Sequence, residues 1–97
     1  MKYRLLPQAE VDLEAIGDYV AADNPFAAVR LVDAFEARWR LLALHPFSGA
    51  PREDIAPGIR HLVLGEYLTF YRIADGAIEI LRVLHGRRKI EADDLNS

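Results

Sequence analysis

The residues best suited to chemistry lie near the C-terminal end of the chain, where one histidine stands among cations. His85 follows Arg82 and precedes Arg87, Arg88 and Lys89. Cleavage of RNA without a metal ion needs a base, an acid and cations that stabilise the charge developing on the phosphate. His85 could transfer protons and the arginines could bind the phosphate, so these residue types permit such a reaction.

Further groups for the same reaction occur earlier in the chain: Arg60, Tyr71 and Arg72. Strand geometry limits how they can be combined, because side chains alternate between the two faces of a strand. Strict alternation puts Arg82 on the face of Ile80 and His85 on the opposite face. Arg82 and His85 are therefore expected to point apart unless the strand ends or bulges at Leu84.

Each of these residues also has a structural interpretation, which the sequence favours for His85 and Tyr71. Arg82 lies on a largely apolar strand and could pair with a carboxylate such as Glu53 or Asp54. His85 precedes a glycine, where a histidine commonly ends a strand and bonds to the backbone. A catalytic role therefore has to be shown by geometry, not by residue type.

The strongest candidates for contact with a target are Arg87, Arg88 and Lys89. Three adjacent cations repel one another and contribute little to a fold unless they meet an anion. Nucleic-acid phosphate or an acidic segment of a partner would serve. The alternative is a solvated basic end, which balances the acidic first third of a chain with a net charge of −3.

Composition excludes several classes of site. The chain has 97 residues, of which 52% are apolar, enough for a single domain spanning residues 1–97. It has no cysteine, which excludes disulfides and thiolate ligands and is compatible with a reducing cytoplasm. The three histidines lack metal-ligand spacing, so neither a metal nor another cofactor is expected. No apolar run approaches the roughly 20 residues of a membrane-spanning helix.

The first half of the chain predicts a strand followed by two helices. Residues 2–6 are expected to form the strand, and Pro7 suits the first turn of a helix. Asn24 followed by Pro25 marks the end of that helix and the capped start of the next. Apolar residues recur at helical spacing in both, and the short break between them predicts an antiparallel hairpin.

The second half predicts a loop and then three strands. Residues 46–58 are rich in proline and glycine and are expected to form a loop. Gly65-Glu66 and Asp75-Gly76 are pairs that close tight hairpins, so residues 59–85 should form an antiparallel meander. Residues 91–97 are expected to fray. The order β-α-α-β-β-β predicts an α+β fold, with an antiparallel sheet packed on the N-terminal helical hairpin.

Seen together, these segments resemble the ParE branch of the RelE/ParE toxins of bacterial type II toxin–antitoxin systems. The resemblance spans Pro7 to Arg88, and its most specific part is the last block, RVLHGRR at residues 82–88. The other segments that carry it are Asn24-Pro25, Leu44-His45-Pro46, Gly58-Ile59-Arg60 and Tyr67-Leu68-Thr69-Phe70-Tyr71-Arg72.

The resemblance implies a cytoplasmic toxin that forms a hetero-oligomer with a cognate ParD-like antitoxin. ParE-like toxins are described as inhibitors of DNA gyrase that trap the cleaved DNA complex. RelE-like toxins are instead ribosome-dependent mRNA nucleases with lysine-rich sites. Lysine occurs here only at Lys2 and Lys89. Gyrase inhibition is therefore the favoured expectation, with Arg82, His85 and the basic cluster as target contacts. A nuclease using His85, Arg82, Arg60 and Tyr71 is the alternative.

The antitoxin is expected to cover an apolar surface of the toxin. Leu31, Phe35 and Trp39 recur along one stripe of the second helix and could form that surface, or the antitoxin could add to a sheet edge. Trp39 could equally pack the helical hairpin against the sheet. A module that binds its partner stably without being toxic is a third hypothesis.

Overall fold

The computed structural model describes residues 1–95, which form a mixed five-stranded sheet and three helices. The elements along the chain are β1 (Lys2–Leu5), α1 (Pro7–Asp23), α2 (Pro25–Leu44), β2 (Ala50–Pro51), β3 (Arg60–Leu64), β4 (Tyr67–Ala74), β5 (Ala77–His85) and α3 (Ala92–Leu95). The predicted α+β order is confirmed, and one very short strand, β2, lies within the segment expected to be a loop.

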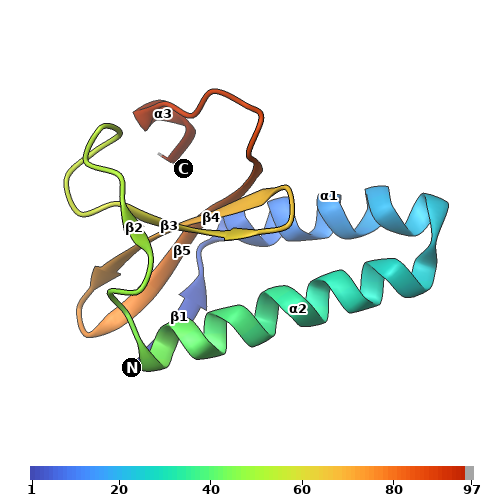
Figure 1. Ribbon diagram of the computed structural model, residues 1–97, viewed down its shortest axis with the longest axis horizontal. Coiled ribbons are helices and arrows are strands. Elements are labelled where there is room, and N and C mark those ends of the chain that lie inside the picture. The colour runs from blue at the N-terminus through green and yellow to red at the C-terminus, as the bar shows by residue number, and fades with distance from the viewer. Residues whose placement is uncertain (96–97) are drawn as a thin grey trace.

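The two long helices begin and end where the sequence predicts. Pro7 occupies the first turn of α1, where its missing N–H leaves no backbone acceptor unsatisfied. The Asn24 side-chain oxygen accepts hydrogen bonds from the backbone N–H groups of Phe26 (3.0 Å) and Ala27 (3.1 Å), which caps α2. The His45 backbone N–H donates to the last carbonyls of α2. The helical hairpin extends beyond the sheet (Figure 1).

The strand order is β1-β5-β4-β3-β2, and the sheet is mixed, not wholly antiparallel as predicted. The meander β3-β4-β5 is antiparallel, but β1 runs parallel to β5. The sequence of β1 does not reveal its direction, because one strand alternates its side chains in the same way whichever neighbour it pairs with. The long connection through α1 and α2 permits the parallel pairing.

One face of the sheet packs on the helices. Phe35, Trp39 and Leu42 from α2 meet Tyr71, Ile78, Ile80 and Val83 from the sheet. The Trp39 indole N–H donates to the Thr69 hydroxyl at 3.2 Å, and its ring stacks on Phe35 with 5.6 Å between the ring centroids. The structure therefore confirms that Trp39 packs the helical hairpin against the sheet.

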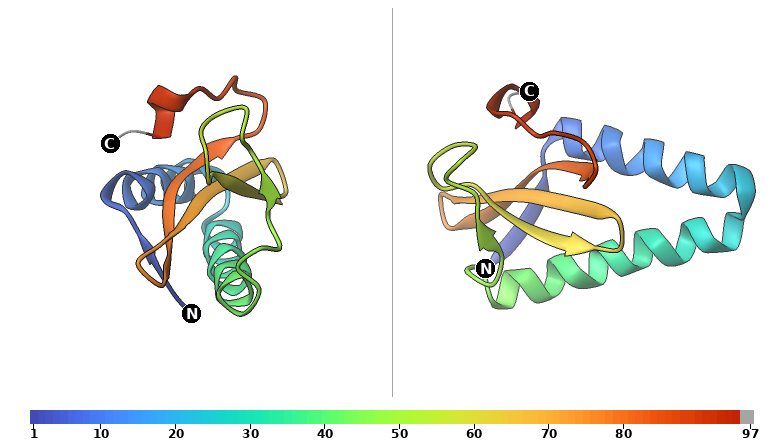
Figure 2. Two further views of the ribbon diagram at one scale, coloured as in Figure 1. Left: turned by 90° about the vertical axis from the view of Figure 1, so that its left-hand side faces the viewer. Right: turned by 45° about the horizontal axis from the view of Figure 1, so that its top comes forward.

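The opposite face of the sheet has its own apolar core, beneath the C-terminal segment. Leu95 of α3 packs with residues of the strands and of the loop before β3: Ile59, Phe70, Leu81 and Leu84. Figures 1 and 2 place α3 and α2 on opposite sides of the sheet. Residues 92–95 are thus ordered, contrary to the prediction that the tail frays. Residues 96 and 97 of that tail lie outside the described residues.

A bulge in β5 changes which residues share a face. Phe70 pairs with Arg82 but Tyr71 pairs with Ile80, so Leu81 is the extra residue. Beyond the bulge, Val83 lies on the helix side with Ile80, and Arg82 shares the opposite side with Phe70. The predicted assignment of Arg82 to the face of Ile80 was therefore wrong. No bulge occurs at Leu84, and Arg82 and His85 still point apart.

A buried carboxylate ties three strands together on the side away from the helices. Glu79 accepts hydrogen bonds from Arg4 of β1 and from Arg72 of β4 (2.7 Å), its register partners on either side. These two guanidinium groups lower the pKa of Glu79 below its ordinary value of 4.5. The ionised form is therefore favoured in the folded chain.

The lowered pKa of Glu79 predicts a pH-dependent contribution to stability. A carboxylate with a depressed folded-state pKa stabilises the fold above about pH 4.5, and this stabilisation is lost as pH falls through the folded-state value. Glu79→Gln should therefore unfold in less urea than the parent chain at pH 7. The difference between the two should narrow steadily below pH 4.5. A difference that stays constant down to pH 2 would contradict this assignment.

Candidate functional site

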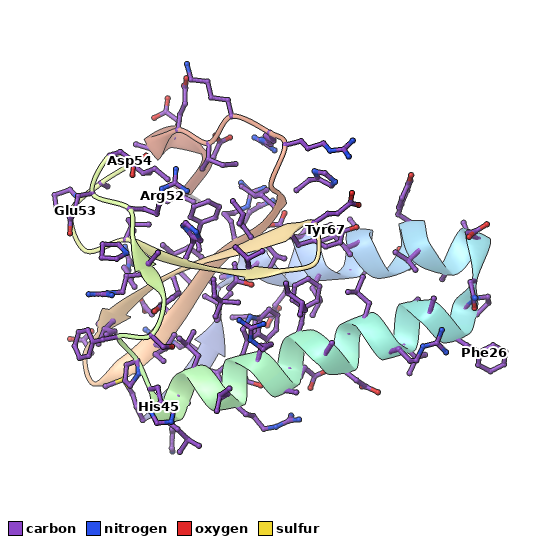
Figure 3. The ribbon with its side chains drawn as sticks, viewed as in Figure 1. Phe26, His45, Arg52, Glu53, Asp54 and Tyr67 are labelled. Carbon is purple, nitrogen blue, oxygen red and sulfur yellow. The ribbon has the colours of Figure 1, made fainter. Side chains whose placement is uncertain are left out.

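A pocket lined by two of the predicted target contacts, His85 and Arg87, lies between α1 and the end of the meander. It encloses about 470 Å³. Tyr67, labelled in Figure 3, begins β4 and also packs edge-on against Phe35 of α2. The lining residues come from α1, from the β3–β4 turn with the start of β4, and from the end of β5: Ala15, Ile16, Tyr19, Glu66, Tyr67, His85 and Arg87.

Contacts around His85 hold its ring in place. Its Nδ1 atom accepts a hydrogen bond from the Arg87 backbone N–H at 3.2 Å, so the proton of the neutral ring lies on Nε2. Nε2 is 3.6 Å from a Glu66 carboxylate oxygen, too far for a hydrogen bond. The ring packs edge-on against Tyr67, with 5.6 Å between centroids. With Nδ1 occupied, the ring has one nitrogen for a partner.

The predicted basic cluster does not form a single surface. The Arg87 side chain is 85% exposed and lies 3.6 Å from Glu66, and Lys89 is equally exposed, 3.6 Å from Glu91. Arg88 instead pairs with Asp94 of α3, at the base of the segment that covers the second face of the sheet. Arg87 and Lys89 are therefore available for a target, whereas Arg88 also holds the C-terminal segment.

Arg82 belongs to a different cluster, between α1, β5 and α3. Its guanidinium forms a two-pronged ion pair with Asp12, at 2.6 and 3.0 Å, and donates to the Asp94 carbonyl at 2.6 Å. The suggested partners Glu53 and Asp54 were wrong, since Asp54 pairs with Arg52. Sequence reasoning missed Asp12 because it is one of several acids along α1 and only the fold selects it.

Arg60 and Tyr71 both anchor the segment that follows α2. The Tyr71 hydroxyl donates to the Pro46 carbonyl (2.8 Å) and accepts from the Gly49 backbone N–H (3.0 Å). Arg60 donates to the Gly49 carbonyl at 2.7 Å. Burial raises the pKa of Tyr71, which keeps its hydroxyl protonated. Both side chains are occupied in holding this loop.

The same loop carries a second polar group around Arg52. Figure 3 shows Arg52, Glu53 and Asp54 together on it. Arg52 bonds Asp54 through two nitrogens and lies 3.3 Å from Nδ1 of His61. Burial, and then the Arg52 charge, lower the pKa of His61, so that it is neutral at pH 7.

The four residues proposed for RNA cleavage therefore do not share a site. Arg60 and Tyr71 hold the loop after α2, Arg82 holds α1 and α3, and His85 lies in the pocket beside α1. Within residues 1–95 no group of three or more acidic or histidine side chains is arranged to hold a metal ion. The pocket itself holds Glu66, His85 and Arg87 as its charged or titratable groups besides two tyrosines.

The residues expected to bind the antitoxin lie mostly inside the molecule. Phe35 and Trp39 are 0% and 1% exposed, and Leu31 is partly buried against the same core. The structure corrects that expectation for the two aromatic residues, which leave almost no surface for a partner. The prediction of an apolar stripe on α2 was correct, but this stripe packs against the sheet.

A family model described as "ParE toxin of type II toxin-antitoxin system, parDE" matches residues 3–90. The chain belongs to the ParE toxin family. Among curated relatives it is 33% identical to Toxin ParE1 of Caulobacter vibrioides, over 86% of each chain. It is 32% identical to Toxin ParE1 of Mycobacterium tuberculosis, over 93% of this chain and 94% of the relative.

A solved structure supports the same ParE assignment through the fold. The match, described as "Chromosomal ParDE TA system from P. aeruginosa", has a TM-score of 0.75 and 30% sequence identity. It covers 88% of this chain and 95% of that one. No helix within residues 1–95 is long and apolar enough to cross a membrane.

Proposed function

We propose that this ParE-family chain is a toxin that a ParD-like antitoxin neutralises in a hetero-oligomer, and that the free toxin inhibits DNA gyrase. The observation that carries the proposal is the family match over residues 3–90, in agreement with the fold. The solved relative is itself described as a ParDE system. In this proposal the toxin acts in the cytoplasm by binding, without chemistry of its own.

The target contacts in this proposal are the pocket with His85 and the exposed cations beside it. Arg87 and Lys89 extend into solvent, and the aromatic rings of Tyr19 and Tyr67 line the same region. Arg82 is engaged by Asp12 and by the Asp94 carbonyl, and Arg88 by the Asp94 carboxylate, so in this proposal both hold the C-terminal segment and do not contact the target directly. A cationic and aromatic surface suits contact with a protein–DNA complex.

The antitoxin surface in this proposal is the exposed apolar side of the helical hairpin. Tyr19, Phe26 and Val29 expose 80%, 75% and 61% of their surface, which is unusual for residues of this size. They lie around the tip of the hairpin, next to a shallow hollow between α1 and α2. Covering these side chains would give the hydrophobic core of an interface.

A gyrase assay with the purified chain tests this function. We expect the chain to inhibit supercoiling and to accumulate cleaved DNA, and the product of the neighbouring gene to relieve both effects. A chain that arrests growth, leaves gyrase untouched and produces new mRNA cuts on translating ribosomes would overturn the gyrase assignment in favour of the nuclease.

Replacing both exposed cations, Arg87→Ala with Lys89→Ala, should reduce gyrase inhibition at least about tenfold, because two charges facing the target are lost. The midpoint of thermal unfolding should stay within a few degrees of the parent value, since surface substitutions usually change stability by less than about 0.5 kcal/mol. Arg30→Ala, which removes an exposed cation from α2, is the matched control and should keep full inhibition. Equal inhibition by the parent chain, the double variant and Arg30→Ala would show that Arg87 and Lys89 do not contact the target.

A further inference from the structure

Glu66 lies between two nitrogen donors of the pocket beside α1. Its carboxylate directs one oxygen toward Nε2 of His85 and the other toward the Arg87 guanidinium, each at a distance of 3.6 Å. Both distances are too long for a direct hydrogen bond. His85 and Arg87 therefore face the same carboxylate, and neither of them is hydrogen-bonded to it.

The backbone of Glu66 is fixed, whereas its side chain is not. The Gly86 N–H donates to the Glu66 carbonyl at 2.8 Å, and Gly65, with a φ of 59°, forms the turn before β4. The Glu66 side chain is nevertheless 65% exposed, and that of Arg87 is 85% exposed. Ion pairs between such exposed groups contribute little, because water screens the charges and two long side chains must be ordered. An incoming anion could therefore displace the Glu66 carboxylate at little free-energy cost.

The His85 ring presents one oriented donor to the same position. Its Nδ1 atom accepts the Arg87 backbone N–H, which leaves the Nε2 proton on the side of the carboxylate. Because the ring also packs edge-on against Tyr67, little side-chain freedom is lost when Nε2 binds an anion. A carboxylate that approached both donors to about 2.7–2.9 Å would form two hydrogen bonds of the strong, charge-assisted kind.

We propose that His85 and Arg87 form a carboxylate-binding subsite, that Glu66 occupies it in the free toxin, and that an acidic side chain of the target protein displaces Glu66. The proposal rests on the toxin function proposed above, because it names the chemistry by which this surface contacts its target. Glu66 is an internal competitor that weakens binding of the target. The rings of Tyr19 and Tyr67, which line the same pocket, take an apolar residue beside the acid.

The charges around the pocket favour a single carboxylate over a nucleic acid. The helix that lines one side of the pocket, α1, exposes acids at every fourth residue, which place them along one side of the helix: Glu10, Glu14 and Asp18. A nucleic-acid strand carries a phosphate at every nucleotide and extends beyond one pocket, so these acids would repel its neighbouring phosphates. A lone acidic side chain of a protein avoids this repulsion.

Two dipeptides with blocked ends, leucine-glutamate and leucine-glutamine, test the subsite. We expect leucine-glutamate, added to the full chain, to shift the NMR signals of the His85 ring and of the Arg87 side chain. Leucine-glutamine should bind at least about threefold more weakly, because it lacks the charge. Arg87→Ala should abolish this difference between the dipeptides. Equal binding of the two dipeptides by the parent chain would overturn the proposal.

The variant Glu66→Gln, which keeps the size of the side chain and removes its charge, tests the role of Glu66 as a competitor. Leucine-glutamate should bind this variant about threefold more tightly than the parent chain, as expected for the loss of one exposed like charge. Glu53→Gln is the matched control, because Glu53 is an exposed acid on the loop after α2, away from Tyr67 (Figure 3). It should bind as the parent chain does. Unchanged affinity in Glu66→Gln, or equal gains in both variants, would contradict the competitor role.

Gyrase inhibition by the same variants distinguishes this inference from the proposed function. If the target supplies the acid, Glu66→Gln should inhibit gyrase at about one third of the parent concentration. The expected dipeptide results without any gyrase inhibition would support the subsite and overturn the gyrase assignment alone. Equal inhibition by the parent chain and Glu66→Gln would overturn the displacement of Glu66 by the target. A 5′-phosphorylated oligonucleotide that displaces leucine-glutamate and binds Glu66→Gln more tightly would assign the subsite to phosphate instead.

Discussion

Replacing Arg82 by alanine is expected to lower the free energy of unfolding by about 3 kcal/mol, a large share of the roughly 5–15 kcal/mol typical of a small domain. Arg82 and Asp12 retain only 14% and 10% of their side-chain exposure. Without the guanidinium, the Asp12 carboxylate would keep only its bond from the Val83 backbone N–H, and the Asp94 carbonyl would lose its donor. Urea unfolding followed by circular dichroism measures this loss.

Two variants distinguish a broken ion pair from a general effect of substitution. Arg82→Met combined with Asp12→Leu removes both charges and should cost less than Arg82→Ala alone, because no uncompensated charge stays buried. Arg30→Ala, at an exposed site on α2, should change stability by less than about 0.5 kcal/mol. A loss below about 1 kcal/mol for Arg82→Ala would indicate that the Arg82–Asp12 pair is solvent-exposed. Arg82 would then again be a candidate for contact with the target.

Replacing Trp39 by alanine is the second change with a large expected effect, about 3–5 kcal/mol. The indole fills the centre of the core between Phe35 and Tyr3, and it is the donor to the buried Thr69 hydroxyl. The substitution leaves a cavity and an unpaired hydroxyl together. Thermal unfolding by circular dichroism should show a much lower midpoint.

The controls for Trp39 separate a core role from a partner role. Trp39→Phe keeps most of the volume and should lose only about 1–2 kcal/mol, mainly through the missing N–H donor. Leu41→Ala, half-exposed on the same helix, should be close to neutral. If Trp39→Ala left stability unchanged and only weakened antitoxin binding, the position of Trp39 in the core would be wrong.

Much of the fold could be predicted because the signals are local. The cap at Asn24 and the first-turn proline at Pro7 act within one helical turn, and both lie where expected. The turns of the meander need positive φ, which Gly65 and Gly76 adopt at 59° and 72°. Helical periodicity likewise identified the buried stripe of α2, including Phe35 and Trp39.

The features that could not be predicted depend on pairings between distant residues. The parallel direction of β1, the bulge at Leu81 and the choice of Asp12 as the partner of Arg82 all follow from how the sheet closes. The basic cluster was expected to act as one unit, yet the fold places Asp94 beside Arg88 and leaves Arg87 in solvent. A site whose residues come from several helices and strands can be recognised only from the tertiary structure.

The position of β5 between β1 and β4 also constrains the order of events during synthesis. Arg4 and its partner Glu79 are 75 residues apart, so the sheet cannot close until β5 has left the ribosome. Until then α2 has emerged with its apolar stripe uncovered, because the strands that cover Trp39 follow it. High contact order of this kind slows folding and leaves apolar surface open to other proteins. The chain is therefore expected to gain its native surface only after β5 has emerged from the ribosome.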